Sequence, residues 1–145
     1  MGLFDFLNKK TEPRFSEEQI IRKAIEGKMA YDKRDFKMAA KHFDDYFKMK
    51  GFGHFPRLDA DDFRMYLNLM ISHFYSKDYQ ACRDTCNTLI RLDPNASDAY
   101  AFYALSSYKM GDPTTANKYW EMAKARNNQM TQIFDKVSDV KMEGF

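Results

Sequence analysis

One short turn occurs three times in this chain, each time between two stretches with a helical apolar pattern. Each copy opens on an aromatic residue and reaches an Asp four places later: YDKRD at 31–35, FYSKD at 74–78 and YKMGD at 108–112. Asp35, Asp78 and Asp112 stand where a helix N-cap is expected, because a carboxylate accepts hydrogen bonds from the first free N–H groups of a helix. Pro113 follows at the first helical position, where its missing N–H costs nothing. The turns therefore predict a helix on either side of each Asp.

Apolar residues recur every three or four positions around each turn, which is the period of a helix with one buried face. Around the second turn these residues are Tyr66, Leu69, Met70, His73, Phe74, Tyr79, Cys82, Cys86 and Leu89. Gly (6) and Pro (4) are scarce, which argues against a turn-rich all-β fold. We therefore predict an all-α fold built of helix–turn–helix units.

The spacing of the turns relates these units to a known family. The second and third Asp are 34 residues apart, and tetratricopeptide repeats are helix–turn–helix units of that period. In the third unit Ala116 and Trp120 match the small-residue and aromatic positions of such repeats, and Cys82 and Cys86 stand there in the second. The chain resembles the tetratricopeptide repeat family over roughly residues 20–128. The resemblance implies a right-handed α-α superhelix of three repeats within 16–128, at about 20–50, 63–96 and 97–128.

The first unit fits the family less well, since Lys23 and Glu26 stand where bulky apolar residues are expected. Extra residues separate it from the second unit, and we place them in an inserted loop at 51–59. Two interpretations of Phe52 and Phe55 in this loop remain open. They either border a binding face or fill the gap over the irregular first repeat.

The two ends of the chain complete the predicted organisation. Residues 1–15 form an amphipathic or flexible segment, after which Ser16 and Gln19 make a capping box that starts the first helix. We expect residues 129–145 to be a capping helix and tail, because a solenoid exposes the apolar face of its last repeat. The apolar stripe of this segment is made of Ile133, Phe134, Val137 and Val140.

In tetratricopeptide folds the first helix of each pair lines the concave face, so the resemblance implies a peptide-binding groove. Its predicted lining is Lys28, Tyr31, Arg64, Leu67, Asn68, Ile71, Phe74, Tyr75, Ala101, Leu105, Tyr108 and Lys109, with Ala24, Asp32 and Asp98 on equivalent positions. Aromatic residues at helical spacing also pack in cores, and for Phe74 and Tyr108 that alternative stays open.

One subclass of the family grips the C-terminal carboxylate of heat-shock chaperones with Lys, Asn and Arg side chains. The matching positions here are Ala24, Lys28, Asn68, Asp98 and Phe102, and only Asn68 agrees. Asp98 would repel a carboxylate, so we do not expect this chaperone clamp.

The first residues, MGLFDFLNKK, carry an apolar group made of Leu3, Phe4, Phe6 and Leu7. The myristoylation pattern is incomplete, because Phe6 stands where Ser or Thr is wanted. Three roles remain open for this segment: disorder or simple packing, docking in the groove of its own or a neighbouring chain, or weak contact with a membrane surface.

Composition narrows the class of function. A net charge of +2 gives no basic field for nucleic acid. Cys82 and Cys86 share one helix face, a poor geometry for a disulfide, and are interpreted as buried structural thiols in a reducing compartment. No secretory signal or membrane-spanning run is present, so we expect a cytoplasmic protein. No catalytic set, phosphate loop or metal-ligand spacing is found, so we expect no enzyme, cofactor or metal.

The leading hypothesis is therefore a small, bacterial, non-catalytic interaction module, a scaffold or adaptor whose groove binds a peptide segment of a protein partner. One alternative is a dedicated chaperone for exported proteins, similar to the translocator chaperones of type III secretion. Another is a membrane-surface adaptor that uses Leu3 to Leu7. Self-association is compatible with each of these.

Overall fold

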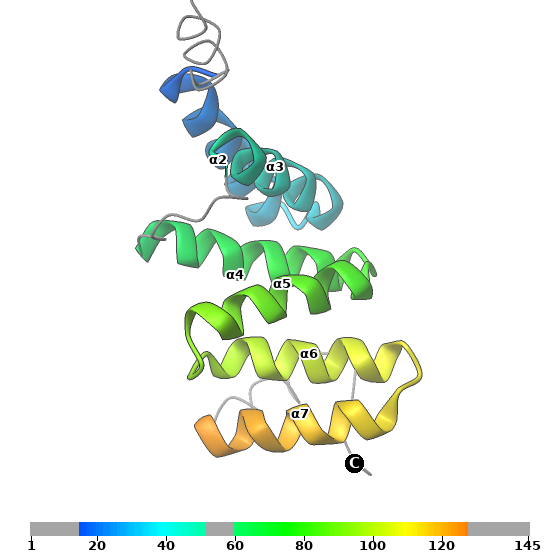
Figure 1. Cartoon of the computed structure of the whole chain (residues 1–145). Helices are drawn as coiled ribbons and strands as arrows, with labels where there is room; N and C mark the ends of the chain where they lie inside the picture. Colours follow the sequence, from blue (N-terminus) through cyan, green and yellow to red (C-terminus); the bar gives the residue numbers. More distant parts are fainter. Residues whose placement is uncertain (1–14, 52–59, 128–145) are drawn as a thin grey trace, which may run out of the picture.

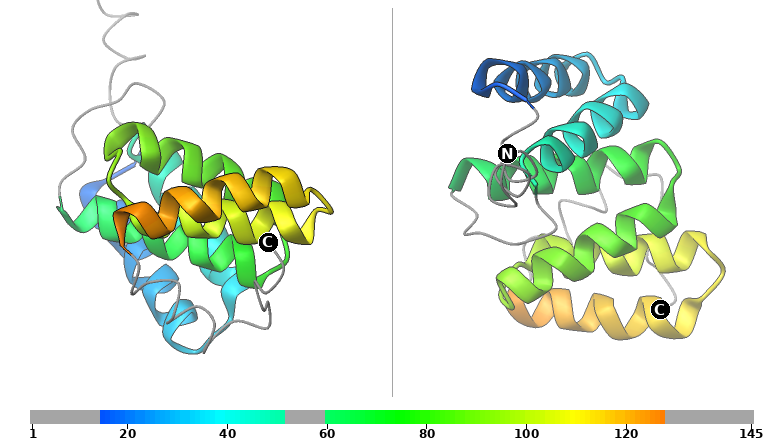
Figure 2. Two further views of the ribbon diagram at one scale, coloured as in Figure 1. Left: turned by 90° about the horizontal axis from the view of Figure 1, so that it is seen from below. Right: turned by 45° about the horizontal axis from the view of Figure 1, so that its top comes forward.

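The computed structural model describes residues 15–51 and 60–127, which form six α-helices and no strand. The helices are α2 (Glu17–Asp32), α3 (Phe36–Met49), α4 (Ala60–Tyr75), α5 (Tyr79–Leu92), α6 (Ser97–Lys109) and α7 (Pro113–Arg126). Each helix packs against the next along the chain. The result is a stack that runs from α2 and α3 at one end to α6 and α7 at the other (Figures 1 and 2). The predicted all-α class is confirmed for these residues.

The three turns that recur in the sequence have the same backbone geometry. Arg34, Lys77 and Gly111, which precede the three Asp residues, have positive φ angles of 62°, 67° and 81°. In each turn the Asp N–H donates at 2.9 Å to the carbonyl oxygen five residues earlier. The preceding N–H donates at 3.0 Å to the carbonyl oxygen three residues earlier. The pairs α2–α3, α4–α5 and α6–α7 are therefore joined in the same way.

The predicted helix caps are present at each of these starts. The side chains of Asp35, Asp78 and Asp112 each accept a hydrogen bond from the N–H three residues on, at 3.3, 3.2 and 3.2 Å. Ser16 and Gln19 form the predicted capping box at the start of α2. Carboxylate caps satisfy N–H groups that no helical carbonyl can reach, so the beginnings of these helices are set by local sequence.

The core consists of two apolar clusters. The larger joins α4, α5, α6 and α7, and the smaller joins α2 and α3 to Leu69 of α4. Cys82 and Cys86 are free thiols, fully buried in the larger cluster, which confirms their structural interpretation. Burial, followed by a hydrogen bond with Cys82, raises the pKa of the Cys86 thiol well above its usual value. Neither thiol is therefore available for reaction in the folded chain.

The outward face of α7 is polar, which differs from the expectation that the last repeat exposes an apolar face. Thr114, Asn117, Lys118 and Glu121 are exposed there. The predicted N-terminal segment with Leu3, Phe4, Phe6 and Leu7, loop residues 52–59 and the C-terminal capping helix lie outside the described residues. Among the described helices, none has the length and apolar character needed to cross a membrane.

Candidate peptide-binding site

The predicted groove residues all lie on the first helix of a pair. Lys28 and Tyr31 belong to α2. The second group, Arg64, Leu67, Asn68, Ile71, Phe74 and Tyr75, belongs to α4, and the third, Ala101, Leu105, Tyr108 and Lys109, belongs to α6. These residues differ sharply in exposure, which divides the predicted lining into an accessible part and a buried part.

Three predicted groove residues are buried in this structure, namely Phe74, Ala101 and Leu105. Phe74 is 5% exposed, and Ala101 and Leu105 are 0% exposed. The ring of Phe74 packs edge-on against Phe102 at 5.4 Å, so the core alternative is the correct one for Phe74. Leu67 and Ile71 are partly buried against the same cluster. This stretch of α4 and α6 therefore has little exposed surface in the folded chain.

Two predicted aromatic residues lie nearer the surface. Tyr108 is 45% exposed, so the core alternative does not apply to it, and Lys109 beside it is exposed. Tyr75 is 37% exposed and its ring stacks on Phe36 at 5.0 Å. Tyr31 contacts the same Phe36 edge-on at 5.6 Å. Tyr31 and Tyr75 therefore help to join α2, α3 and α4.

The structure brings three of the predicted residues together in a different place. Lys28, Arg64 and Asn68, with Ala24, line a cavity of about 380 Å³ between α2 and α4, which we call the α2–α4 cavity. Its remaining lining is Ile21, Ile25, Phe43, Tyr46, Asp61, Asp62 and Met65. The bottom of the cavity is formed by α3, since the buried Phe43 and Tyr46 come from that helix.

An exposed apolar stripe runs along α2 at the edge of this cavity. Ile21, Ile25 and Met29 follow one another at four-residue intervals and are 49%, 54% and 53% exposed. Sequence reasoning missed this stripe because it judged the first unit by the polar Lys23 and Glu26. The sequence itself shows the stripe, since large apolar residues at positions i, i+4 and i+8 lie on one side of a helix.

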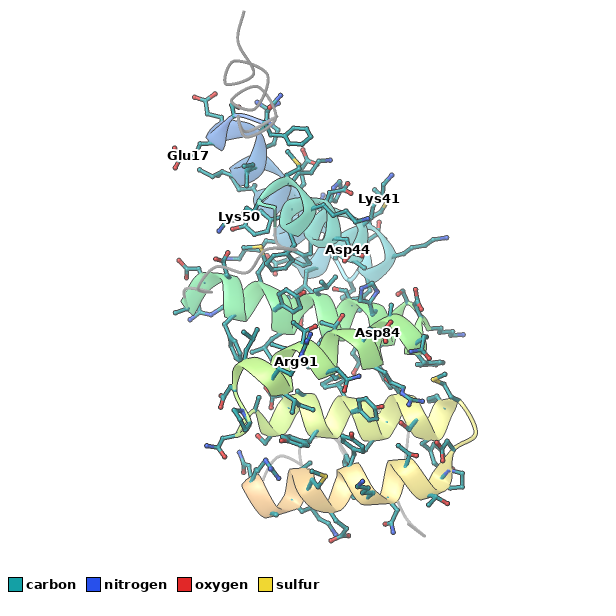
Figure 3. The ribbon with its side chains drawn as sticks, viewed as in Figure 1. Glu17, Lys41, Asp44, Lys50, Asp84 and Arg91 are labelled. Carbon is teal, nitrogen blue, oxygen red and sulfur yellow. The ribbon has the colours of Figure 1, made fainter. Side chains whose placement is uncertain are left out.

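The charge at the start of α4 is compensated inside the protein. Asp62 is buried and accepts a hydrogen bond of 2.7 Å from the Tyr46 hydroxyl and one of 3.0 Å from Lys50 Nζ. Figure 3 labels Lys50 at the end of α3. Burial alone would lower the pKa of Lys50, but its hydrogen bonds with Asp62 and Tyr46 raise it above the usual value. Burial and the bond to Asp62 raise the pKa of Tyr46 as well.

Two cations at the cavity are not compensated in this way. Neither Lys28 nor Arg64 forms an ion pair within residues 15–51 and 60–127, and both are exposed. Asp61 is the one uncompensated anion among the lining residues. The α2–α4 cavity therefore combines apolar walls with a small excess of positive charge at its opening.

Among the described residues, no group of three or more His, Cys, Asp or Glu is placed to hold a metal ion. A scan of protein-family models found no match to the chain, and a search of curated proteins found none either.

Proposed function

We propose that this chain is a non-catalytic interaction protein of the tetratricopeptide-repeat type, which binds a peptide segment of a protein partner in the α2–α4 cavity. The family assignment rests on the 34-residue spacing of two turns and on the identical hydrogen bonds of all three. Repeats of this kind stack into a right-handed superhelix, and the concave side of such a stack is formed by α2, α4 and α6.

The observation that carries the proposal is the exposure of Ile21 and Ile25 beside a cavity. Each leaves about half of its surface in water, although burial of such a side chain stabilises a protein by about 1.5–3 kcal/mol. Clustered exposed apolar residues beside a hollow are typical of binding sites. An amphipathic helical peptide with two or three apolar residues at helical spacing would cover the stripe and fill the cavity.

Lys28 and Arg64, which form no ion pair among the described residues, indicate the charge of the proposed partner. Lys28 and Arg64 lie on opposite sides of the cavity, on α2 and on α4. A carboxylate on the peptide would pair with Arg64 in a bidentate arrangement, which gives orientation as well as affinity. The proposed ligand is therefore an apolar helical segment that carries at least one acidic residue beside its anchors.

Selection from a random peptide display library tests this proposal on the full chain. We expect enriched peptides to share apolar residues at helical spacing and an acidic residue. Ile25→Asp should abolish their binding, and Arg64→Glu should weaken it at least tenfold, which corresponds to about 1.4 kcal/mol. Fluorescence anisotropy with one labelled peptide gives both values.

Met38→Asp on α3 is the matched control, because Met38 is similarly exposed at 40% and does not line the cavity. It should leave peptide affinity unchanged. Equal affinity of the wild type and Ile25→Asp, or a library that yields no helical apolar motif, would overturn the proposal.

A further inference from the structure

Helix α6 is buried around its whole circumference. Every residue from Ala99 to Ser107 is buried, whereas the other helices keep exposed residues on one side. Successive residues of an α-helix point about 100° apart, so an unbroken buried run samples every direction. In the stack α6 lies between α5 and α7 (Figure 1). Those two helices cover two sides of α6, and the remaining directions need other partners.

Three contacts locate the described neighbours of α6. Phe102 meets Phe74 of α4 at 5.4 Å, and Tyr103 stacks on Tyr119 of α7 at 4.0 Å. Arg83 of α5 donates to the Tyr103 hydroxyl at 2.9 Å, which places α5 between these two directions. The opposite side of α6, between α7 and α4, carries Asp98, Ala101, Leu105 and Tyr108. Ala101 and Leu105 have no exposed surface although none of those three contacts reaches their side of the helix.

A polar atom on the same side also lacks a partner. One carboxylate oxygen of Asp98 is buried without a hydrogen bond among the described residues. Burial raises the pKa of this carboxyl above its usual value. A buried acceptor of this kind is ordinarily paired, so Asp98 leaves one hydrogen bond to be made on this side of α6.

The chain leaves α7 close to this side of α6. Arg126 Nε donates to the Pro94 carbonyl at 2.8 Å, and its guanidinium lies 3.9 Å from the centre of the Tyr100 ring. The described part of the chain therefore ends, at Asn127, beside the start of α6, where Asp98 also lies. The next residues offer donors, namely Gln129, Thr131 and Gln132. If residues 130–142 were helical they would span about 20 Å, close to the length of the 13-residue α6.

The apolar stripe of this segment needs an apolar surface. The outward face of α7 does not offer one, since Asn117, Lys118 and Glu121 are exposed there. The concave side of α4 and α6 does, because Ile71, Ala101 and Leu105 lie on it.

We propose that residues 129–145 dock on the concave side of α4 and α6 through Ile133, Phe134, Val137 and Val140. The segment runs parallel to α6 and occupies the groove from within, so that only the α2–α4 cavity stays open to a partner. This inference rests on the burial of α6 and does not depend on what binds in that cavity.

Crosslinking of the full chain tests the position of the segment. Lys109→Cys and Lys141→Cys together place one thiol at the end of α6 and one on the polar side of the segment. The native thiols are buried and do not compete. With a short bis-maleimide in dilute solution, we expect an intramolecular crosslink in most molecules, identified by peptide mapping.

Lys118→Cys with Lys141→Cys is the matched pair, because Lys118 lies on the outward face of α7. It should crosslink at least fivefold less. Preferential reaction of this second pair would put the segment on the outer end, and a crosslinked dimer would put it on a second copy. Either result, or equal low yields for both pairs, overturns the proposal.

A substitution in the stripe supplies an independent readout. Phe134→Asp in the crosslinking variant should lower the intramolecular yield at least fivefold. Burying a charged carboxylate in an apolar contact costs free energy, so the segment should dock less. Asp135→Lys, on the opposite side of the predicted helix, should leave the yield unchanged. An unchanged yield with Phe134→Asp would show that the stripe does not hold the segment.

Discussion

Gly27 allows α2 and α3 to approach each other closely. A Cβ atom built at this position would lie 2.7 Å from two ring carbons of Phe43, which is itself fully buried. The ring has no free space to move into, because protein cores are packed at crystal density. Glycine is therefore required by the contact and not by the backbone, since a helix interior accepts most L-residues and prefers alanine.

We expect Gly27→Ala to destabilise the chain. Alanine gains about 1 kcal/mol in helix propensity, but overpacking a tight contact costs about 1–3 kcal/mol, so the net loss is about 1 kcal/mol. Urea unfolding followed by circular dichroism measures the free energy of unfolding. In a Phe43→Leu background the same substitution should cost less, because the two positions touch. A Gly27→Ala chain more stable than the wild type would show that the helices separate without cost.

At the level of single elements, the turns between paired helices share one backbone geometry. This geometry predicts different effects on stability for two reciprocal substitutions. Lys77 and Gly111 occupy equivalent positions with positive φ, a region that costs a residue with a side chain about 1–2 kcal/mol. A Cβ at Gly111 would meet nothing within 4 Å, so only the backbone cost applies there. Gly111→Ala should therefore destabilise by about 1 kcal/mol, and Lys77→Gly should be neutral or stabilise.

Thermal unfolding of the two variants checks this pair. Exposed Lys118→Ala, inside α7, is the control for side-chain removal alone and should change the melting temperature little. Destabilisation by Lys77→Gly as large as that by Gly111→Ala would mean that the lysine side chain, and not the backbone, holds the second turn.

Local features of this chain could be predicted from its sequence, and features that depend on distant packing could not. Asp35, Asp78 and Asp112 were recognised as caps because a cap and the N–H groups it satisfies lie within one turn of helix. The burial of Ala101 and Leu105 depends on what lies across from α6, which spacing along one helix does not reveal. The pairing of Asp62 with Tyr46 and Lys50 was missed for the same reason, since it joins two helices.

The whole molecule contains several tyrosines whose ionisation opposes folding. Burial raises the pKa of Tyr31, Tyr46, Tyr66 and Tyr119 above the ordinary value of 10.0. A raised pKa means that the folded chain holds these protons more tightly than the unfolded chain does. Their contribution to stability is therefore complete below pH 10 and is lost as the pH rises through the raised values. Lys50 acts in the same direction above its ordinary value of 10.5.

Stability should consequently be level between about pH 8 and 9.5 and should fall steeply above about pH 10.5. Urea unfolding at a series of pH values, with tyrosinate absorbance recorded in parallel, measures both quantities. Tyr46→Phe removes one of the groups and should make the fall shallower. A free energy of unfolding that stays constant to about pH 11 would contradict the inference that the folded chain holds the protons of these wholly or partly buried tyrosines more tightly.

The identical hydrogen bonds of the three turns also bear on how such a chain can change in length. A break placed before Asp78 and another before Asp112 fall at the same point of the same backbone arrangement. Tandem duplication of residues 78–111 would therefore join Gly111 to a second Asp78 through a junction that the protein already contains. Adding or removing whole helix pairs therefore requires no new kind of turn. The number of helix pairs is the feature of this architecture that can change most easily.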